Sequence, residues 1–324
     1  MKPTVLLSAP YMIPFKDRFV PVLESYGLHV IVPEVHERLS EEEILVYAGK
    51  FDGIICGDDR FSKRVIDSCL PRLKVISKWG TGIDSIDKTY ANSVGVMVGN
   101  TPNAFSIPVS DSVLGYILAF ARRIQWMDTA MKSGQWDKIP GRSLSECTLG
   151  VIGVGNVGKA VIRRAHAFGM RLLGNDIQEI DPDFILEHGL KMVTLEELMR
   201  LSDFISVNCD LNVTSYHLIN ENSLSFVQNH AVLINTARGQ IVDEAALIHW
   251  LQLGKLSGAA LDVFEVEPLP KSSPLLSMDN VMLAPHNSNS SPEAWERVHW
   301  NTIKNLLIGI GMESSELNKF KLNK

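Results

Sequence analysis

The feature that most constrains this sequence is a repeated alternation of short apolar segments with helical segments along nearly all of its 324 residues. This alternation predicts parallel strands with helices on both faces of the sheet. In the first hundred residues the predicted strands are 5–9, 29–33, 53–57, 74–77 and 95–98. A second series of predicted strands is 148–154, 171–175, 204–208, 231–235, 258–263 and 281–284. A long helical pattern (109–122) and an irregular arm (131–141) separate the series, so we expect two doubly wound α/β domains.

Charge and hydropathy exclude two classes of partner. The formal net charge is -6, and lysines and arginines are scattered along the chain, so we expect no nucleic-acid partner. No stretch of about 18 apolar residues occurs, so we expect no membrane-spanning segment. The N-terminal apolar run is interrupted by Pro10 and Pro14 and does not resemble a signal peptide.

The four cysteines give no sign of a metal site or a disulfide framework. Cys56, Cys69, Cys147 and Cys209 form no CxxC pair and have no histidine at zinc-ligand spacing. We therefore predict no metal and reduced thiols, which are the norm in the cytosol. The expected location is cytoplasmic.

The strongest local motif is the glycine loop 153–158, which follows an apolar strand and opens a helix. Gly153 would permit the tight turn, Gly155 the close approach of a pyrophosphate, and Gly158 close packing of helix on strand. Phosphates bind at such a helix N-terminus because its backbone amides are unpaired. Glycine-rich turns alone are common, but the strand and helix around this one predict a dinucleotide site.

An acidic residue stands where a ribose would be recognised. Asp176 ends the predicted strand 171–175, and no lysine or arginine follows it closely. A carboxylate there accepts hydrogen bonds from ribose hydroxyls and repels a 2′-phosphate, so the sequence favours NAD over NADP.

Three polar residues follow three predicted strands of the second series. Arg238 follows 231–235, Glu267 follows 258–263, and His286 follows 281–284. The carboxyl ends of parallel strands meet at one edge of the sheet, where ligands bind. Taken singly, a loop arginine is often a surface ion-pair residue, and a histidine after proline is often a packed turn residue. Beside a dinucleotide loop, the three together indicate a catalytic site.

These residue types suit the chemistry of a 2-hydroxy acid. A guanidinium binds a carboxylate in a bidentate manner, which suits Arg238. An imidazole exchanges protons near neutral pH, which suits His286 as the group that gives or takes the hydroxyl proton. A carboxylate beside it, such as Glu267, favours the charged imidazole and fixes its tautomer.

Several motifs in order give the chain a family resemblance. They are the segments 78–84, 153–158, 235–239, 261–268 and 285–286. From about residue 73 to residue 286 the chain resembles the D-isomer-specific 2-hydroxyacid dehydrogenases. The resemblance implies NAD-dependent hydride transfer at C2 of a small acid, with Arg238, Glu267 and His286 as the catalytic set.

The resemblance also implies binding residues. Backbone amides around Thr81 and Gly82 would hold the substrate carboxylate. Besides the loop glycines, the implied cofactor contacts are Asn156, Val157, Asp176, Thr236, Ala237 and Asp262.

The domain order implied by the resemblance is discontinuous. A flavodoxin-like substrate domain would comprise residues 1–100 and 288–324, with a Rossmann NAD-binding domain, 101–287, inserted into it. Members of the family are usually homodimers that associate through the long helix and the arm around 134–141.

The chain departs from the family pattern at 109–112, at Asp210 and Asn212, and at 287–290. The last departure follows the predicted catalytic histidine, so the identity of the acid stays open among 3-phosphoglycerate, hydroxypyruvate, glyoxylate and larger acids. Lys78 either anchors a substrate phosphate or is a solvated lysine at a strand end. The main alternative function is an NAD(H)-binding sensor or corepressor of the same fold.

Overall fold

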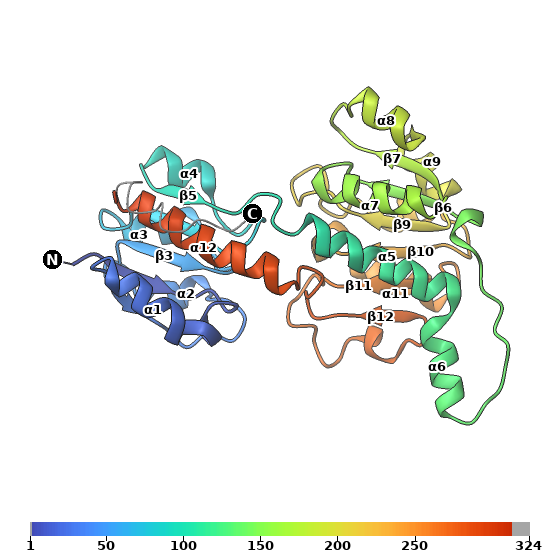
Figure 1. The fold of residues 1–324 in the computed structure, drawn as a ribbon, viewed down its shortest axis with the longest axis horizontal. Helices are drawn as coiled ribbons and strands as arrows, with labels where there is room; N and C mark the ends of the chain where they lie inside the picture. The colour runs from blue at the N-terminus through green and yellow to red at the C-terminus, as the bar shows by residue number, and fades with distance from the viewer. Residues whose placement is uncertain (1, 313–324) are drawn as a thin grey trace. The chain divides into compact units, whose positions relative to one another are not determined.

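A computed structural model describes residues 2–312 and divides the chain into two compact units (Figure 1). The first unit runs to Phe105 and resumes at Ser291, and the second is Ser106–Ser290. The chain therefore passes between the units after residues 105 and 290, whereas the sequence-based domain boundaries followed residues 100 and 287.

The first unit contains a five-stranded parallel sheet in the order β2-β1-β3-β4-β5. Its strands are β1 (Thr4–Leu7), β2 (His29–Ile31), β3 (Gly53–Cys56), β4 (Val75–Lys78) and β5 (Met97–Gly99). Its helices are α1 (Lys16–Ser25), α2 (Glu41–Leu45), α3 (Lys63–Cys69), α4 (Lys88–Ser93) and α12 (Pro292–Gly309). This strand order is that of flavodoxin-like doubly wound sheets, as expected from the sequence.

Helix α12 completes the first unit from the far end of the sequence. It packs on β3, β4 and β5 so closely that a Cβ on Gly309 would lie 2.4 Å from the Val75 side chain. Ser77 in β4 also donates a hydrogen bond to the carbonyl of Thr302 at 2.7 Å. The C-terminal helix is therefore an integral part of this unit.

The second unit contains a seven-stranded parallel sheet in the order β12-β11-β10-β9-β6-β7-β8. Its strands are β6 (Thr148–Ile152), β7 (Arg171–Asn175), β8 (Leu190–Met192), β9 (Phe204–Val207), β10 (Val232–Asn235), β11 (Gly258–Leu261) and β12 (Val281–Leu283). Its helices are α5 (Ser106–Arg122), α6 (Ile124–Lys132), α7 (Asn156–Ala167), α8 (Pro182–His188), α9 (Leu195–Leu201), α10 (Glu221–Leu224) and α11 (Glu244–Gln252). The order is that of a Rossmann sheet with one further strand, β12, at its edge.

Alternate residues of the central strands supply two separate cores. Val151 of β6 packs with α5 and α7, whereas the next residue, Ile152, packs with α9 and α11. Figure 1 shows α5 and α7 side by side over one face of this sheet. Burial on both faces explains why these strands are almost continuously apolar.

Several helices begin at residues whose side chains cap the helix N-terminus. Four capping boxes form within the described residues, among them one with Ser40 at the start of α2 and one with Thr194 at the start of α9. Strand β8 was not predicted, because the exposed Lys191 interrupts its three-residue apolar run. Within residues 2–312, no helix combines the length and apolarity that crossing a membrane requires.

Candidate active site

The candidate active site lies at the carboxyl edge of the sheet in the second unit. Strands β10, β11 and β12 are hydrogen-bonded neighbours, with Asn235 opposite Leu261 and Leu261 opposite Leu283. Arg238, Glu267 and His286 each follow one of these strands. The fold therefore brings the three residues to adjacent turns of one edge, as the sequence predicted.

His286 and Glu267 form a pair. The imidazole Nδ1 lies 3.1 Å from Glu267 Oε2, and the two side chains are 22% and 16% exposed. The other carboxylate oxygen accepts a hydrogen bond from the Phe264 amide at 3.0 Å. An ionised Glu267 accepts from Nδ1–H, which fixes the tautomer and the orientation of the imidazole ring.

The backbone at His286 is held in an unusual conformation. Its φ is 51°, in the left-handed region that few non-glycine residues adopt. Its amide donates to the Asp262 carbonyl at 2.8 Å. The carboxylate of Asp262 accepts from the amides of Asn287 at 2.8 Å and Ser288 at 2.9 Å. Strained residues persist where their surroundings fix them, and such sites are often functional.

Sequence reasoning missed this positioning role of Asp262. The residue is 1% exposed and was predicted only as a cofactor contact. Its signal in the sequence is an aspartate directly after the apolar strand β11, which must find hydrogen-bond donors when buried.

Arg238 lies in a turn that packs on the turn carrying Glu267. Its guanidinium donates to the Ala237 carbonyl at 2.8 Å, and its own carbonyl accepts from Asn235 Nδ2 at 2.9 Å. A Cβ on the next residue, Gly239, would lie 1.9 Å from the Phe264 carbonyl carbon. Only glycine permits this approach, so the Arg238 and Glu267 turns are fixed against each other.

A polar cluster reinforces the same two turns. Glu265 Oε1 lies 2.9 Å from His217 Nε2 and accepts from the Glu244 amide at 3.0 Å. The Glu265 carbonyl accepts from Gln240 Nε2 at 2.9 Å. Burial raises the pKa of Glu244, and the neighbouring Glu265 charge raises it further.

The glycine loop has the geometry that its sequence predicted. Gly153 has φ +87°, and a Cβ there would lie 2.5 Å from the Cys209 amide nitrogen. A Cβ on Gly158 would lie 2.0 Å from the Gly153 carbonyl oxygen. At Gly155, the N-cap of α7, a Cβ would meet nothing within 4 Å. Two glycines thus close the turn, and the third leaves open space at the helix N-terminus.

Asp176 links this loop to β7. One carboxylate oxygen accepts from the Val154 amide at 2.6 Å and the other from the Gln178 amide at 2.8 Å. Each carboxylate oxygen has a second lone pair, so both retain capacity for ligand hydroxyls.

Orphaned polar atoms test whether this edge fits a nicotinamide cofactor. Within the described residues, the buried oxygens Thr236 Oγ1 and Asn208 Oδ1 have no hydrogen-bond partner. They follow β10 and β9, at the same edge as the glycine loop. Buried polar atoms normally have hydrogen-bond partners, so a polar ligand at this edge would satisfy these two oxygens. The residues present therefore fit a dinucleotide whose polar groups reach this edge.

The loop after β4 in the first unit carries the predicted substrate contacts. The backbone amides of Thr81 and Gly82 make no hydrogen bond within residues 2–312, so both remain available to an anion. A side-chain hydrogen bond fixes the loop backbone, because Asn100 Nδ2 donates to the Thr81 carbonyl at 2.6 Å. Thr81 Oγ1 donates to the Thr101 carbonyl at 2.9 Å.

Lys78 is buried, so its interpretation as a solvated lysine is wrong. It is 4% exposed, and its Nζ lies 3.0 Å from Asp58 Oδ1 and 2.9 Å from the Trp79 carbonyl oxygen. Trp79 is also buried, and it donates from Nε1 to His299 Nδ1 at 2.9 Å. Burial lowers the pKa of His299 to about 4.

Comparisons with known proteins show which proteins this chain resembles. The family model described as "D-isomer specific 2-hydroxyacid dehydrogenase, NAD binding domain" matches residues 114–288. A glyoxylate reductase from Thermofilum pendens is 38% identical over 83% of this chain and 81% of its own length. A D-3-phosphoglycerate dehydrogenase from Methanocaldococcus jannaschii is 37% identical over 87% of this chain, which spans only 53% of that relative.

A solved structure extends the likeness to the whole fold. The structure of D-lactate dehydrogenase from Aquifex aeolicus, complexed with NAD and lactic acid, superposes with a TM-score of 0.83. It is 28% identical in sequence, and the match covers 98% of this chain and 97% of that one.

Proposed function

This chain belongs to the D-isomer-specific 2-hydroxyacid dehydrogenase family, and on this premise we propose that Arg238, Glu267 and His286 are its catalytic residues. The protein is an NAD-dependent oxidoreductase that transfers hydride between nicotinamide and C2 of a small 2-hydroxy or 2-keto acid. A sensor or corepressor function is not favoured. The observation that carries the catalytic assignment is the pairing of His286 Nδ1 with Glu267 at 3.1 Å.

The proposed roles follow from the chemistry of each side chain. When bound, NAD supplies the hydride acceptor for a hydroxy acid, and NADH the hydride donor for a keto acid. His286 Nε2 takes the hydroxyl proton in one direction and returns it in the other. Glu267 stabilises the imidazolium and sets its orientation. The Arg238 guanidinium binds the carboxylate and carbonyl oxygens of the acid.

The cofactor-binding residues are assigned on the same edge. The loop of Gly153, Gly155 and Gly158 would hold the pyrophosphate together with the first residues of α7, Asn156 and Val157. Asp176 would accept from the adenosine ribose hydroxyls. Thr236, Ala237 and Asp262 would lie toward the nicotinamide, and the orphaned Thr236 Oγ1 supports this placement.

The substrate class that the site favours is a small unphosphorylated 2-keto acid such as glyoxylate or hydroxypyruvate. The Lys78 charge is already balanced by Asp58, which argues against a role in anchoring the phosphate of 3-phosphoglycerate. The free amides of Thr81 and Gly82 suit the carboxylate that all candidate acids share.

A substrate panel tests these assignments. We expect purified protein to consume NADH with glyoxylate or hydroxypyruvate, and more slowly with phosphohydroxypyruvate. In His286→Ala, kcat should fall about 10²–10⁴-fold, the usual contribution of a general acid–base group, while NADH binding is retained. Faster turnover of the phosphorylated acid would contradict the substrate proposal, and full activity in His286→Ala would contradict the catalytic one.

The same premise gives each unit a role. We infer that Ser106–Ser290 is the cofactor domain, because the matched NAD-binding family model lies within it. The other unit would then be the substrate domain. Separate expression of residues 101–290, followed by NADH titration, tests this division.

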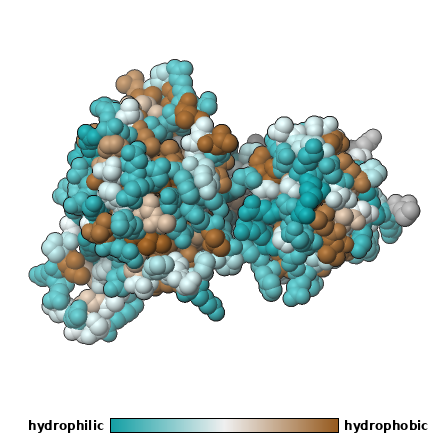
Figure 2. All heavy atoms as spheres, turned by 180° about the vertical axis from the view of Figure 1, so that it is seen from behind, coloured by the Kyte–Doolittle hydropathy of each residue, from teal (hydrophilic) through white to brown (hydrophobic). Residues whose placement is uncertain are grey.

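We also infer a homodimer and a cytoplasmic location. Helices α5 and α6 and the following arm expose Ile107, Ile124, Met131 and Trp136, the last at 80%. Brown apolar side chains are visible at the lower left of Figure 2, where α6 and the arm lie. Light scattering tests the dimer, and Trp136→Ser should shift it toward monomer.

The four cysteines are free thiols, which is consistent with the cytoplasm, and cell fractionation tests this location.

A further inference from the structure

A depression lined by arginines lies at the amino edge of the sheet in the second unit, opposite the edge that carries the candidate active site. It is open to solvent and has a volume of about 570 Å³. Its lining residues precede or begin the adjoining strands β7, β6, β9 and β10: Arg142, Thr148, Arg171, Arg200, Leu201, Asp203, Gln228 and His230. The proposed function makes no use of this surface.

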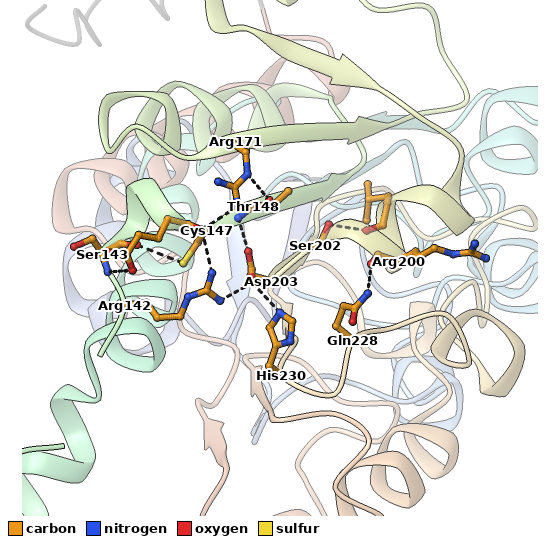
Figure 3. Close-up of polar contacts among 12 residues, drawn as sticks. Arg142, Ser143, Cys147, Thr148, Arg171, Arg200, Ser202, Asp203, Gln228 and His230 are labelled. Atoms are coloured by element: carbon orange, nitrogen blue, oxygen red, sulfur yellow. Dashed lines mark hydrogen bonds and ion pairs between the residues drawn. The ribbon is translucent and has the colours of Figure 1, made fainter. Parts of the chain in front are cut away.

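The polar lining is rich in donors, and its one carboxylate, Asp203, already makes three polar contacts. Asp203 Oδ1 accepts from Arg142 Nη1 at 2.5 Å and lies 2.8 Å from His230 Nε2. Asp203 Oδ2 accepts from the Thr148 amide at 2.7 Å. Although burial opposes its ionisation, these hydrogen bonds lower the pKa of Asp203, so it stays charged. Figure 3 shows Asp203 at the centre, with Arg142, Thr148 and His230 directed toward it.

Arg171 brings a positive charge that no carboxylate balances. Its Nε donates to Thr148 Oγ1 at 3.0 Å and its Nη2 to the Glu146 carbonyl at 2.9 Å. Within residues 2–312 it forms no ion pair. A guanidinium has five N–H groups, so three have no acceptor among the described residues. By contrast, the Arg200 guanidinium is paired with Glu196.

The guanidinium groups of Arg142 and Arg171 are held side by side. Both donate to the same Glu146 carbonyl oxygen, at 3.0 Å and 2.9 Å, so their terminal nitrogens lie less than about 6 Å apart. Asp203 balances the charge of Arg142, so this pair of guanidinium groups carries one uncompensated positive charge, that of Arg171, which an anion can balance. The shared carbonyl fixes both forks before any ligand arrives, which reduces the entropy lost on binding.

From this juxtaposition we propose that the depression binds a phosphate-class anion between Arg142 and Arg171. Two planar guanidinium forks match the oxygens of a phosphate group, which accepts several charge-assisted hydrogen bonds at once. Gln228 lines the same depression, and its amide has one N–H left after donating to the Arg200 carbonyl at 2.7 Å. The ligand is either inorganic phosphate or the phosphate group of a small monoester.

This site is separate from the cofactor loop. Strand β6 has Thr148, in the depression, at its amino end, and the glycine loop follows its carboxyl end. Phosphate bound at the depression therefore does not compete with the dinucleotide.

The test measures thermal unfolding of the whole protein in increasing inorganic phosphate, against chloride at equal ionic strength. A ligand that binds only the folded state raises Tm with its concentration. We expect a saturable rise in Tm that persists with saturating NADH. In Arg171→Gln, the half-saturating phosphate concentration should increase about tenfold or more, for loss of one charge-assisted donor group. Arg171→Lys, which keeps the charge but not the fork, should lose less.

The matched control is Arg297→Gln, which removes an exposed guanidinium of the other unit, paired with Glu293, and should respond to phosphate as the parent protein does. Glycerol phosphate as a second probe distinguishes the sources. A response to it alone identifies a monoester, and a response to inorganic phosphate alone identifies the free ion. The proposal is overturned if Tm does not rise, if Arg171→Gln responds as strongly as the parent protein, or if NADH abolishes the rise.

Discussion

The two units carry similar parallel sheets, but the carboxyl edges of these sheets hold their polar groups differently. In the first unit, buried charges after β3 and β4 satisfy one another or nearby loops. Lys78 pairs with Asp58, and Asp59 accepts hydrogen bonds from Ser8 and from the Leu39 amide. In the second unit, the corresponding edge leaves Thr236 Oγ1 and Asn208 Oδ1 without partners. The buried charges of the first edge are paired internally, so what stays unpaired there among the described residues is neutral: the Thr81 and Gly82 amides and the Ser62 and Ser85 hydroxyls. At the second edge, the unpaired oxygens lie on the edge that also carries the glycine loop and the His286–Glu267 pair.

Polar groups that are fully paired and polar groups that position a reacting side chain should respond differently to substitution. Where polar groups are fully paired, we expect substitutions to change stability more than turnover. Where they position a reacting side chain, we expect turnover to change more than stability. Three substitutions test the contrast.

Asp262→Asn should have the largest effect, on turnover. An asparagine offers one acceptor and one donor to the amides of Asn287 and Ser288, so one amide meets a donor and the His286 turn shifts. A displacement of about 1 Å at a catalytic group costs about 10²-fold in rate, and we expect a loss of kcat of this order. The measurement is kcat and both KM values. A loss confined to KM for NADH would instead make Asp262 a cofactor contact alone.

Lys78→Met should act on stability. It removes the ammonium that the Asp58 carboxylate and the Trp79 carbonyl contact in a buried site, which should cost about 1–3 kcal/mol. Urea unfolding measures this loss, with the exposed Lys255→Met as control. At temperatures where the variant is folded, kcat/KM for glyoxylate should stay close to that of the parent protein. A large loss of kcat/KM without loss of stability would indicate that Lys78 binds the substrate after all.

Asp59→Asn should have the smallest effect, and one that depends on pH. Burial raises the pKa of Asp59 from 3.8 to about 6. A carboxyl whose folded pKa is raised contributes stability below about pH 4, and that contribution is lost as pH rises through 6. Asparagine avoids the ionisation, so the variant should gain about 1–2 kcal/mol over the parent protein at pH 8 relative to pH 4.

His299 also contributes to the pH dependence of stability, and because its pKa is lowered its contribution has the opposite sign to that of Asp59. The unfolded state binds a proton at His299 near pH 6.5 and the folded state only near pH 4, so stability falls as pH falls between these values. Urea midpoints of Asp59→Asn and the parent protein, compared from pH 4 to pH 8, isolate the Asp59 contribution. If the urea midpoints of the two proteins changed with pH in parallel, the pKa of Asp59 would not be raised in the folded state.

The sequence by itself determined the features that depend on neighbouring residues. The glycine loop, the capping boxes at Ser40 and Thr194, and the position of Arg238, Glu267 and His286 after strands were all readable, because each follows from a local pattern. The two-domain α/β fold was predictable for the same reason. Edge strand β8 was not, since the exposed Lys191 interrupts its short apolar run.

Only the tertiary structure decided which distant residues meet. Asp262 holds the His286 turn, Lys78 pairs with Asp58, and Arg142 and Arg171 share the Glu146 carbonyl. In each case the partners lie on different segments that the sheets bring together. A side chain's role then depends on burial and on the acceptors left to it. Neither property is encoded in a local pattern, because both arise when the segments pack.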